Sequence, residues 1–219
     1  MTGPLKRIPP YRVYRDFLPA GERAALLEWA IANEALFGAA GLGRAQKVDL
    51  TMRNSLNVRA KVAQPWRRVL RERFMAMLPE WTAAFGMAAF EVSVIEFDMI
   101  AYNDGAYYRR HSDLGPRNRH GGDPSLPGLP GDRLITAVYY FHNEPKGFEG
   151  GDLRLYPIAR PGPRKAEAFA DIPPEQNSLA VFPSWAPHEV LPVRCASGAF
   201  GDSRFAVNCW IRRARETPV

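Results

Sequence analysis

A change in hydrophobic period near residue 90 constrains the fold of this chain more than any other feature. Before it, two segments, 20–33 and 66–81, repeat apolar residues three and four positions apart, as amphipathic helices do. After it, Phe90, Val92 and Val94 alternate with polar residues. Strand-like runs then follow without helices between them, at 95–102, 134–141, 152–156, 178–182, 188–193 and 204–211. Helices first and strands afterwards predict an α+β fold with an antiparallel sandwich or jelly roll, and not alternating βαβ units.

The composition fits such a turn-rich fold. The chain contains 18 Gly and 20 Pro in 219 residues, which disfavours a helix bundle. Its 46% hydrophobic and 24% charged residues exclude wholesale disorder. We expect one domain over 1–219, with residues 1–89 as a mainly helical support and 90–214 as the β core. Residues 52–58 are expected to form one short strand, and the apolar stripe of 66–81 is expected to pack on the sheet.

Several features bear on the compartment. No apolar run approaches the ~18 residues that would span a bilayer. The first ten residues are basic and lack the apolar stretch of a secretory signal, so we expect a cytoplasmic protein. Cys195 and Cys209 have no zinc-type spacing and are expected to be reduced, buried residues.

The net charge of +6 is unevenly distributed. Residues 1–73 hold 14 Lys and Arg against 6 Asp and Glu, whereas residues 74–219 hold 15 against 17. Residues 74–219, which contain the predicted β core, are therefore close to neutral. This distribution does not favour a nucleic-acid partner.

Two of the four histidines indicate a metal site. His111 and Asp113 are two residues apart, so in an extended segment their side chains point to the same side. His188, on a later predicted strand, can be the third ligand. Two histidines and one carboxylate leave coordination positions open, which suits non-haem Fe(II) in O₂ chemistry. A zinc hydrolase could use the same residue types, but the usual HExxH pattern is absent.

Arg204 is the candidate cation for a dicarboxylate co-substrate. It opens the run 204–210, 16 residues after His188. A guanidinium binds a carboxylate through two parallel hydrogen bonds, which fixes the orientation of the ligand as well as its charge. The alternative is a surface salt bridge.

About half of the chain, from Phe97 to Trp210, resembles a known family. It is similar to the catalytic domain of 2-oxoglutarate- and Fe(II)-dependent oxygenases, in the branch that resembles prolyl 4-hydroxylases. The matching pieces are Tyr102 with Tyr108-x-x-His111-x-Asp113, Arg133-x-Ile135-Thr136-x-Val138-Tyr139-Tyr140, Gly150-Gly151-Asp152-Leu153, Phe182-x-Ser184, His188-Glu189-Val190, and Arg204-x-Ala206-x-Asn208-x-Trp210. The segment 197–203 departs from the family pattern as an inserted turn before Arg204.

The resemblance implies a double-stranded β-helix of mainly antiparallel strands with N-terminal helices on one face. It implies Fe(II), 2-oxoglutarate and O₂ as cofactor and co-substrates, with ascorbate as a stimulant. The residues it implies are His111, Asp113 and His188 on iron, Arg204 and Tyr140 on the C5 carboxylate of 2-oxoglutarate, Tyr102 near both, Leu153 and Trp210 as pocket walls, and Asn208 as a small polar residue in the pocket.

The implied reaction hydroxylates an unactivated C–H bond and releases succinate and CO₂. Expected substrates are a prolyl or other residue of a protein or peptide, or a related small metabolite. Because Asp113 is present, we expect hydroxylation and not chlorination. A nucleic-acid demethylase of the same superfamily is an alternative, but those enzymes carry a second arginine where this chain has Trp210. A non-catalytic binding module on this fold is another.

Two loops remain. Residues 114–132 hold nine Gly and Pro directly after the predicted iron ligands. Loops of this length inside a domain are usually functional, so we expect a substrate lid, with a surface insertion as the alternative. The second loop, 158–177, is rich in Pro and charge and has no predicted role.

Overall fold

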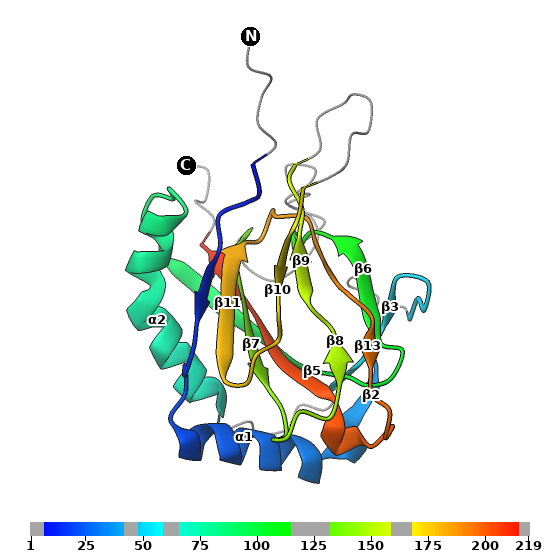
Figure 1. Cartoon of the computed structure of the whole chain (residues 1–219). Coiled ribbons are helices and arrows are strands. Elements are labelled where there is room, and N and C mark those ends of the chain that lie inside the picture. Colours follow the sequence, from blue (N-terminus) through cyan, green and yellow to red (C-terminus); the bar gives the residue numbers. More distant parts are fainter. Residues whose placement is uncertain (1–6, 42–47, 59–65, 115–131, 159–167, 215–219) are drawn as a thin grey trace, which may run out of the picture.

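The computed structural model describes residues 7–41, 48–58, 66–114, 132–158 and 168–214. Within these residues two α-helices accompany a set of short and long strands (Figure 1). The elements are β1 (Arg12–Tyr14), α1 (Ala20–Ala32), β2 (Phe37–Ala39), β3 (Arg53–Asn54), β4 (Leu56–Val58), α2 (Trp66–Ala84), β5 (Val92–Tyr102), β6 (Tyr107–His111), β7 (Asp132–Phe141), β8 (Glu149–Gly150), β9 (Leu153–Leu155), β10 (Ala170–Ile172), β11 (Ser178–Pro183), β12 (His188–Val190), β13 (Val193–Arg194) and β14 (Arg204–Arg213). Short 3₁₀ turns lie at Glu34–Leu36 and Phe200–Asp202.

Two antiparallel sheets form the β part of the molecule. The large sheet has the order β1-β11-β7-β14-β5-β4-β2, and the small sheet has the order β10-β9-β12-β6-β3. Strands β13 and β8 form a separate two-stranded ribbon. Helices α1 and α2 lie outside the large sheet, on the face away from the small one (Figure 1). The predicted α+β jelly roll with helices on one face is confirmed.

The alternation of side chains along β7 and β14 determines which residues face the helices. One set packs with Leu70 and Phe74 of α2 in the main core; it comprises Ile135, Ala137, Tyr139 and Phe141 of β7 and Phe205, Val207, Cys209 and Ile211 of β14. The intervening residues Val138, Tyr140 and Ala206 pack with Leu153 and Leu155 of the small sheet. Because the period is two, Arg204, Asn208 and Trp210 share this inner face. The space between the sheets is therefore where the predicted site residues gather.

The structure confirms some predicted elements and corrects others. The apolar stripe of α2 packs on the large sheet as predicted, and the helix continues to Ala84. The prediction of one strand over 52–58 is wrong, because Ser55 separates β3, which joins the small sheet, from β4, which joins the large one. The single strand predicted over 188–193 is also wrong. It divides at Leu191 and Pro192 into β12, which pairs with β6 and β9, and β13, which pairs with β8.

The loops are described only in part. The proposed lid, 114–132, lies outside the described residues except at its two ends. The loop over 158–177 contains the short strand β10, which pairs with β9. The inserted turn over 197–203 contains a 3₁₀ turn whose Phe200 packs against Phe205. Both cysteines are free and buried. No helix in the described part of the chain is long and apolar enough to cross a membrane.

Candidate metal centre and co-substrate pocket

The three predicted metal ligands converge on one point between the sheets. His111 ends β6 and His188 begins β12, and these residues lie opposite each other in the strand pairing. Asp113 follows β6 by two residues. Its Oδ1 lies 3.6 Å from Nε2 of His111, and its Oδ2 lies 3.6 Å from Nε2 of His188. All the ligand atoms lie within 4.8 Å of one another, so the group could hold one metal ion.

Hydrogen bonds to the backbone orient both imidazoles. Nδ1 of His111 lies 2.8 Å from the carbonyl oxygen of Arg109, and Nδ1 of His188 lies 2.9 Å from that of Ala186. A carbonyl oxygen only accepts, so each Nδ1 carries the proton and each Nε2 presents a lone pair to the centre. Burial and the nearby His111 lower the pKa of His188 to about 4. This imidazole is therefore neutral at neutral pH, as metal binding requires.

Two hydroxyl side chains hold the Asp113 carboxylate. Thr136 of β7 donates a hydrogen bond to Oδ2 of Asp113 at 2.8 Å, and Oγ of Ser184 lies 2.9 Å from the Thr136 hydroxyl. The backbone N–H of Asp113 donates to the carbonyl oxygen of Ser184. Burial alone would raise the pKa of Asp113, but His188 and His111 outweigh it and hold the pKa well below its usual range. The group is thus an ionised, positioned ligand.

Replacing Thr136 with valine is expected to weaken Fe(II) binding by about 10- to 100-fold, the usual effect of removing a hydrogen bond that orients a ligand. Valine keeps the shape of the side chain and removes only the donor. Anaerobic Fe(II) titration measures the change. Thr82→Val is the matched control, because Thr82 lies in α2 and bonds the carbonyl oxygen of Pro79. Equal Fe(II) affinities of the two variants would contradict this role of Thr136.

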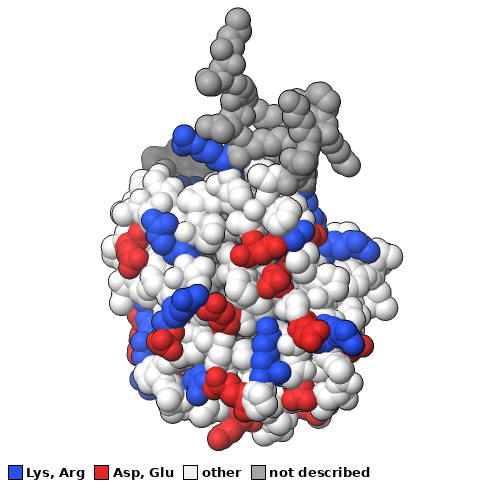
Figure 2. All heavy atoms as spheres, viewed as in Figure 1, with Lys and Arg blue, Asp and Glu red and all other residues white. Residues whose placement is uncertain are grey.

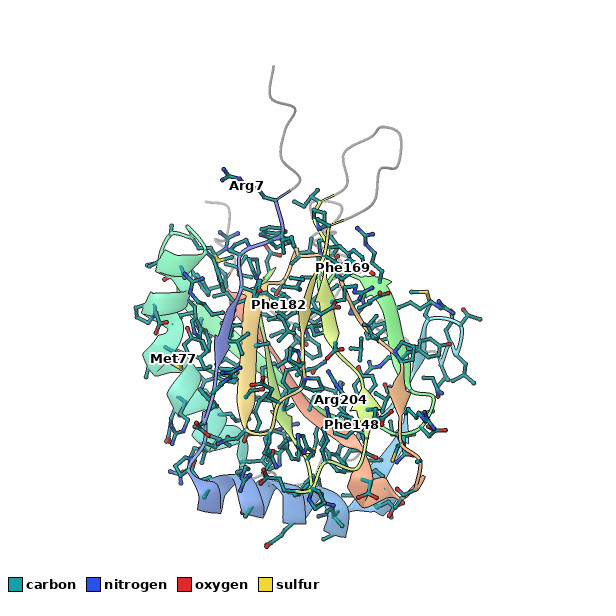
Figure 3. All side chains as sticks on the ribbon, in the orientation of Figure 1. Arg7, Met77, Phe148, Phe169, Phe182 and Arg204 are labelled. Atoms are coloured by element: carbon teal, nitrogen blue, oxygen red, sulfur yellow. The ribbon has the colours of Figure 1, made fainter. Side chains whose placement is uncertain are left out.

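Arg204 and two tyrosines form a second cluster on the inner face. Arg204 is 1% exposed, and its guanidinium carbon lies 4.7 Å from the ring centre of Tyr102 and 4.8 Å from that of Tyr140 (Figure 3). Its Nε donates to the carbonyl oxygen of Gly151 at 2.8 Å. Nη1 of Arg204 and both tyrosine hydroxyls are buried without a hydrogen-bond partner in the described part of the chain. Three unpaired donors around one guanidinium fit a carboxylate ligand.

Tyr140 remains a hydrogen-bond donor at neutral pH. Burial raises the pKa of Tyr140, although the nearby Arg204 charge opposes the change. The phenol is therefore protonated at neutral pH and able to donate to an anion. The donor set thus fits the C5 carboxylate of 2-oxoglutarate. The resemblance implies Arg204 and Tyr140 for this carboxylate, and it implies Tyr102 only as a neighbour of the iron and the co-substrate.

Gly151 has a role that the sequence did not predict. It adopts a φ of +74°, as expected for a tight turn, and a Cβ built on it would lie 2.6 Å from Cδ of Arg204. The same Cβ would lie 2.8 Å from Cγ2 of Val193. Glycine is needed here both for the left-handed backbone and for the close approach of the arginine. The Gly150-Gly151 pair, one of the pieces that match the family, is the sequence signal for this position.

Replacing Gly151 with alanine is expected to raise the KM for 2-oxoglutarate about tenfold, because the Cβ displaces the Arg204 side chain. The matched control is Gly198→Ala. Gly198 also has a positive φ, +63°, but nothing lies within 4 Å of its Cβ position. Both variants carry the backbone strain of about 1–2 kcal/mol, and only one affects the arginine. A similar KM in the two variants would contradict this assignment.

The remaining predicted pocket residues also face the interior. Leu153 is buried in the cluster with Val138 and Tyr140. Asn208 lies opposite Val138 in the strand pairing. The guanidinium carbon of Arg133 lies 4.1 Å from the ring centre of Trp210. The structure therefore brings every predicted site residue to the space between the sheets.

A buried ion cluster beside the metal centre was missed by the sequence reasoning. Arg133 contacts Glu96 through Nε at 2.7 Å and Nη2 at 2.8 Å, and its Nη1 donates to the carbonyl oxygen of Asp113 at 3.3 Å. Arg212 reaches the same Glu96 carboxylate. Burial alone would raise the pKa of Glu96, but the two arginines outweigh it and lower the pKa. The sequence signal that could have predicted this ion cluster is Glu96 itself, a charged residue at an inward-facing position of β5.

Replacing Glu96 with glutamine is expected to lower the free energy of unfolding at pH 7 by about 3 kcal/mol, because the buried Arg212 and the partly buried Arg133 lose their counter-ion. The folded-state pKa of Glu96 lies below its ordinary value of 4.5, so its contribution is present above pH 4.5 and is lost as the pH falls further. Chemical denaturation between pH 3 and pH 7 measures this. The difference between wild type and variant should shrink at the acid end, and a constant difference would contradict the role of the charge.

A comparison with known families identifies the chain. The sequence profile of the 2OG-Fe(II) oxygenase superfamily matches residues 97–212. The chain belongs to this superfamily. The matched segment contains the three residues of the metal centre and Arg204. Members of this superfamily use Fe(II), 2-oxoglutarate and O₂, and the donor sets described above fit the metal ion and the dicarboxylate.

Individual relatives of this chain are consistent with its assignment to the superfamily. A Synechocystis sp. protein named as an uncharacterized PKHD-type hydroxylase is 41% identical over 147 residues, which cover 66% of this chain and 45% of that protein. A prolyl-4-hydroxylase from Pseudomonas putida superposes with a TM-score of 0.60 at 22% identity, covering 94% of both chains. A Trichoplax adhaerens prolyl hydroxylase in complex with a hypoxia-inducible-factor peptide fragment superposes with a TM-score of 0.64 at 18% identity, covering 93% of this chain and 84% of that one. These two structures share the fold.

Proposed function

We propose that this oxygenase is an Fe(II)- and 2-oxoglutarate-dependent dioxygenase that hydroxylates an unactivated C–H bond and releases succinate and CO₂. The proposed metal ligands are His111, Asp113 and His188. The proposed anchor of the co-substrate is Arg204, with Tyr140 and Tyr102 beside it. Bound in this way, Fe(II) and 2-oxoglutarate would supply the O₂ activation that the reaction needs.

One observation carries most of this proposal. A buried arginine and two buried tyrosines of the large sheet leave three donors unpaired in the same space between the sheets as the metal centre. Unpaired buried donors are costly, so a site that holds three of them together favours a ligand that accepts from all three. A non-catalytic module would not need both a dicarboxylate anchor and a three-residue metal centre between its two sheets. Leu153 and Trp210 are proposed as the walls of the pocket, and Asn208 as a polar residue inside it.

The proposed substrate is a prolyl or other amino-acid residue of a protein or peptide, or a related small metabolite. The names of the relatives support a hydroxylase, and one structural neighbour was determined with a peptide. On the face shown in Figure 2, basic and acidic side chains are interspersed and form no continuous basic stripe. The near-neutral balance of residues 74–219, with 15 Lys and Arg against 17 Asp and Glu, favours such substrates over nucleic acid. The cytoplasmic location stays a prediction.

Succinate release that depends on both Fe(II) and 2-oxoglutarate tests the proposed function. The assay includes Pro-containing peptides, free amino acids and methylated oligonucleotides as separate arms, and mass spectrometry measures the gain of one oxygen atom. Stimulation by a peptide or an amino acid is expected. Stimulation by the oligonucleotide alone would favour the demethylase. A chain that binds no Fe(II) in anaerobic titration would favour the binding module.

A further inference from the structure

Two residues of opposite charge, the buried Arg53 and the half-buried Asp98, belong to strands that line the space between the sheets, and each bonds a neutral neighbour. Arg53 of β3 is 7% exposed and donates through Nε to the Ser55 hydroxyl at 2.7 Å. Asp98 of β5 accepts from Nδ2 of Asn57, at 3.2 Å on Oδ1 and 3.3 Å on Oδ2. Among the ion pairs of the described residues, none joins Arg53 to Asp98. The two charges therefore form no direct ion pair, although the charge of Arg53 acts on Asp98 and lowers its pKa.

Both charges face the inner space where substrate would meet the metal. Arg53 lies opposite Tyr108 in the strand pairing, with its guanidinium carbon 4.9 Å from the ring centre of that tyrosine. The same tyrosine ring stacks on His111, with 3.6 Å between ring centres. A single aromatic ring thus separates Arg53 from a proposed iron ligand. Asp98 lies opposite Asn208 of β14, so it shares the inner face with that residue.

The hydrogen-bonding capacity of this group is incomplete. Nη2 of Arg53 and Oδ1 of Asn57 are buried and have no hydrogen-bond partner among the described residues. Burial raises the pKa of Asp98 more than Arg53 and Asn57 lower it, so its negative charge is incompletely balanced. The group therefore offers one unpaired cationic donor on one side, and an unpaired acceptor beside a carboxylate on the other.

A ligand that completes this group must carry an acceptor and a donor a short distance apart. A zwitterionic α-amino acid provides both as full charges on one carbon atom. An internal peptide group offers a neutral C=O and N–H, and for a prolyl residue it offers no N–H at all. Since one protein charge is buried and the other is half-buried, opposite charges on the ligand compensate them better than neutral dipoles do.

We propose, on the basis of the hydroxylase function above, that Arg53, Asn57 and Asp98 bind the charged end of a free α-amino acid substrate. The carboxylate of the substrate binds Nη2 of Arg53, and its ammonium group binds Asp98 and Oδ1 of Asn57. This anchor holds the end of the amino acid that is common to all members of the class and leaves its side chain as the part to be oxidised.

Binding to the wild-type protein is the first test. Isothermal titration under anaerobic conditions, with Fe(II) and 2-oxoglutarate present, uses the free L-amino acids, their N-acetyl derivatives, their carboxamides and a Pro-containing peptide blocked at both ends. At least one free amino acid should bind, with affinity at least tenfold higher than that of its N-acetyl and carboxamide forms. Equal affinity for a blocked form, or binding of the peptide alone, would overturn the proposal.

Two variants give the second test. Asp98→Asn and Arg53→Gln should each weaken binding of that amino acid by at least tenfold. Asp171→Asn is the control, because Asp171 is exposed and bonds Arg154 at the other end of the small sheet. Thermal melting shows whether each variant folds. The titrations of the wild-type protein do not depend on the folding of the variants. If Fe(II) and 2-oxoglutarate bind but no free amino acid does, this inference is wrong and the proposed function stands. If none of them binds, both are wrong.

Discussion

Replacing His188 with alanine is expected to abolish specific Fe(II) binding and to lower 2-oxoglutarate-dependent succinate release by about a thousandfold or more, which corresponds to roughly 4 kcal/mol in the barrier. His188 is buried and neutral, and its Nδ1 bonds the carbonyl oxygen of Ala186, so its Nε2 is committed to the metal centre. Alanine leaves only one histidine and one carboxylate. Anaerobic Fe(II) titration and the succinate assay measure the two effects separately.

The third histidine of the described residues, His142, provides the control. His142 is as buried as His188, but it follows β7 and its Nδ1 bonds the carbonyl oxygen of Asn143. His142→Gln therefore removes a buried imidazole without touching the metal centre, and it should retain Fe(II) binding. If His188→Ala binds Fe(II) as tightly as His142→Gln, the proposed ligand set is wrong.

The metal centre was the part of the molecule most open to prediction from the sequence. His111 and Asp113 are two residues apart in an extended segment, so the period of a strand alone places them on one side. The alternation along β14 likewise places Arg204 and Trp210 on one face before the partner strands are known. Placing His188 beside them needed the resemblance as well, because no local rule fixes how β12 pairs with β6.

The features missed by prediction depend on distant contacts or on very short elements. Strands of two or three residues, such as β3 and β10, are too short for a period to emerge. The division at Ser55 follows from the pairing of β3 and β4 with different sheets. The contact between Gly151 and Arg204 joins residues 53 positions apart. Charges such as Asp98 look like surface residues in the sequence, and only the fold shows that they face inward.

Replacing Arg204 with glutamine is expected to raise the KM for 2-oxoglutarate about a hundredfold, since removing one partner of a buried, hydrogen-bonded charge pair costs about 2–5 kcal/mol. Arg204→Lys should recover only part of this affinity, because an ammonium group cannot form two parallel bonds to a carboxylate. The Fe(II) affinity without co-substrate should change little, because Arg204 contacts Gly151, Tyr102 and Tyr140 and not the metal centre.

A 2-oxo acid with a single carboxylate separates loss of recognition from loss of fold. 2-Oxopentanoate keeps the 2-oxo acid group of 2-oxoglutarate and lacks the C5 carboxylate. The wild-type protein should strongly prefer 2-oxoglutarate, whereas Arg204→Gln should bind the two acids with similar affinity, because nothing remains to compensate the second charge. Arg154→Gln is the control: Arg154 bonds Asp171 and lies outside the described contacts of the pocket, so its preference should match the wild type. If Arg204→Gln keeps the wild-type preference, another group binds the C5 carboxylate, and the unpaired donors around Arg204 serve a different ligand.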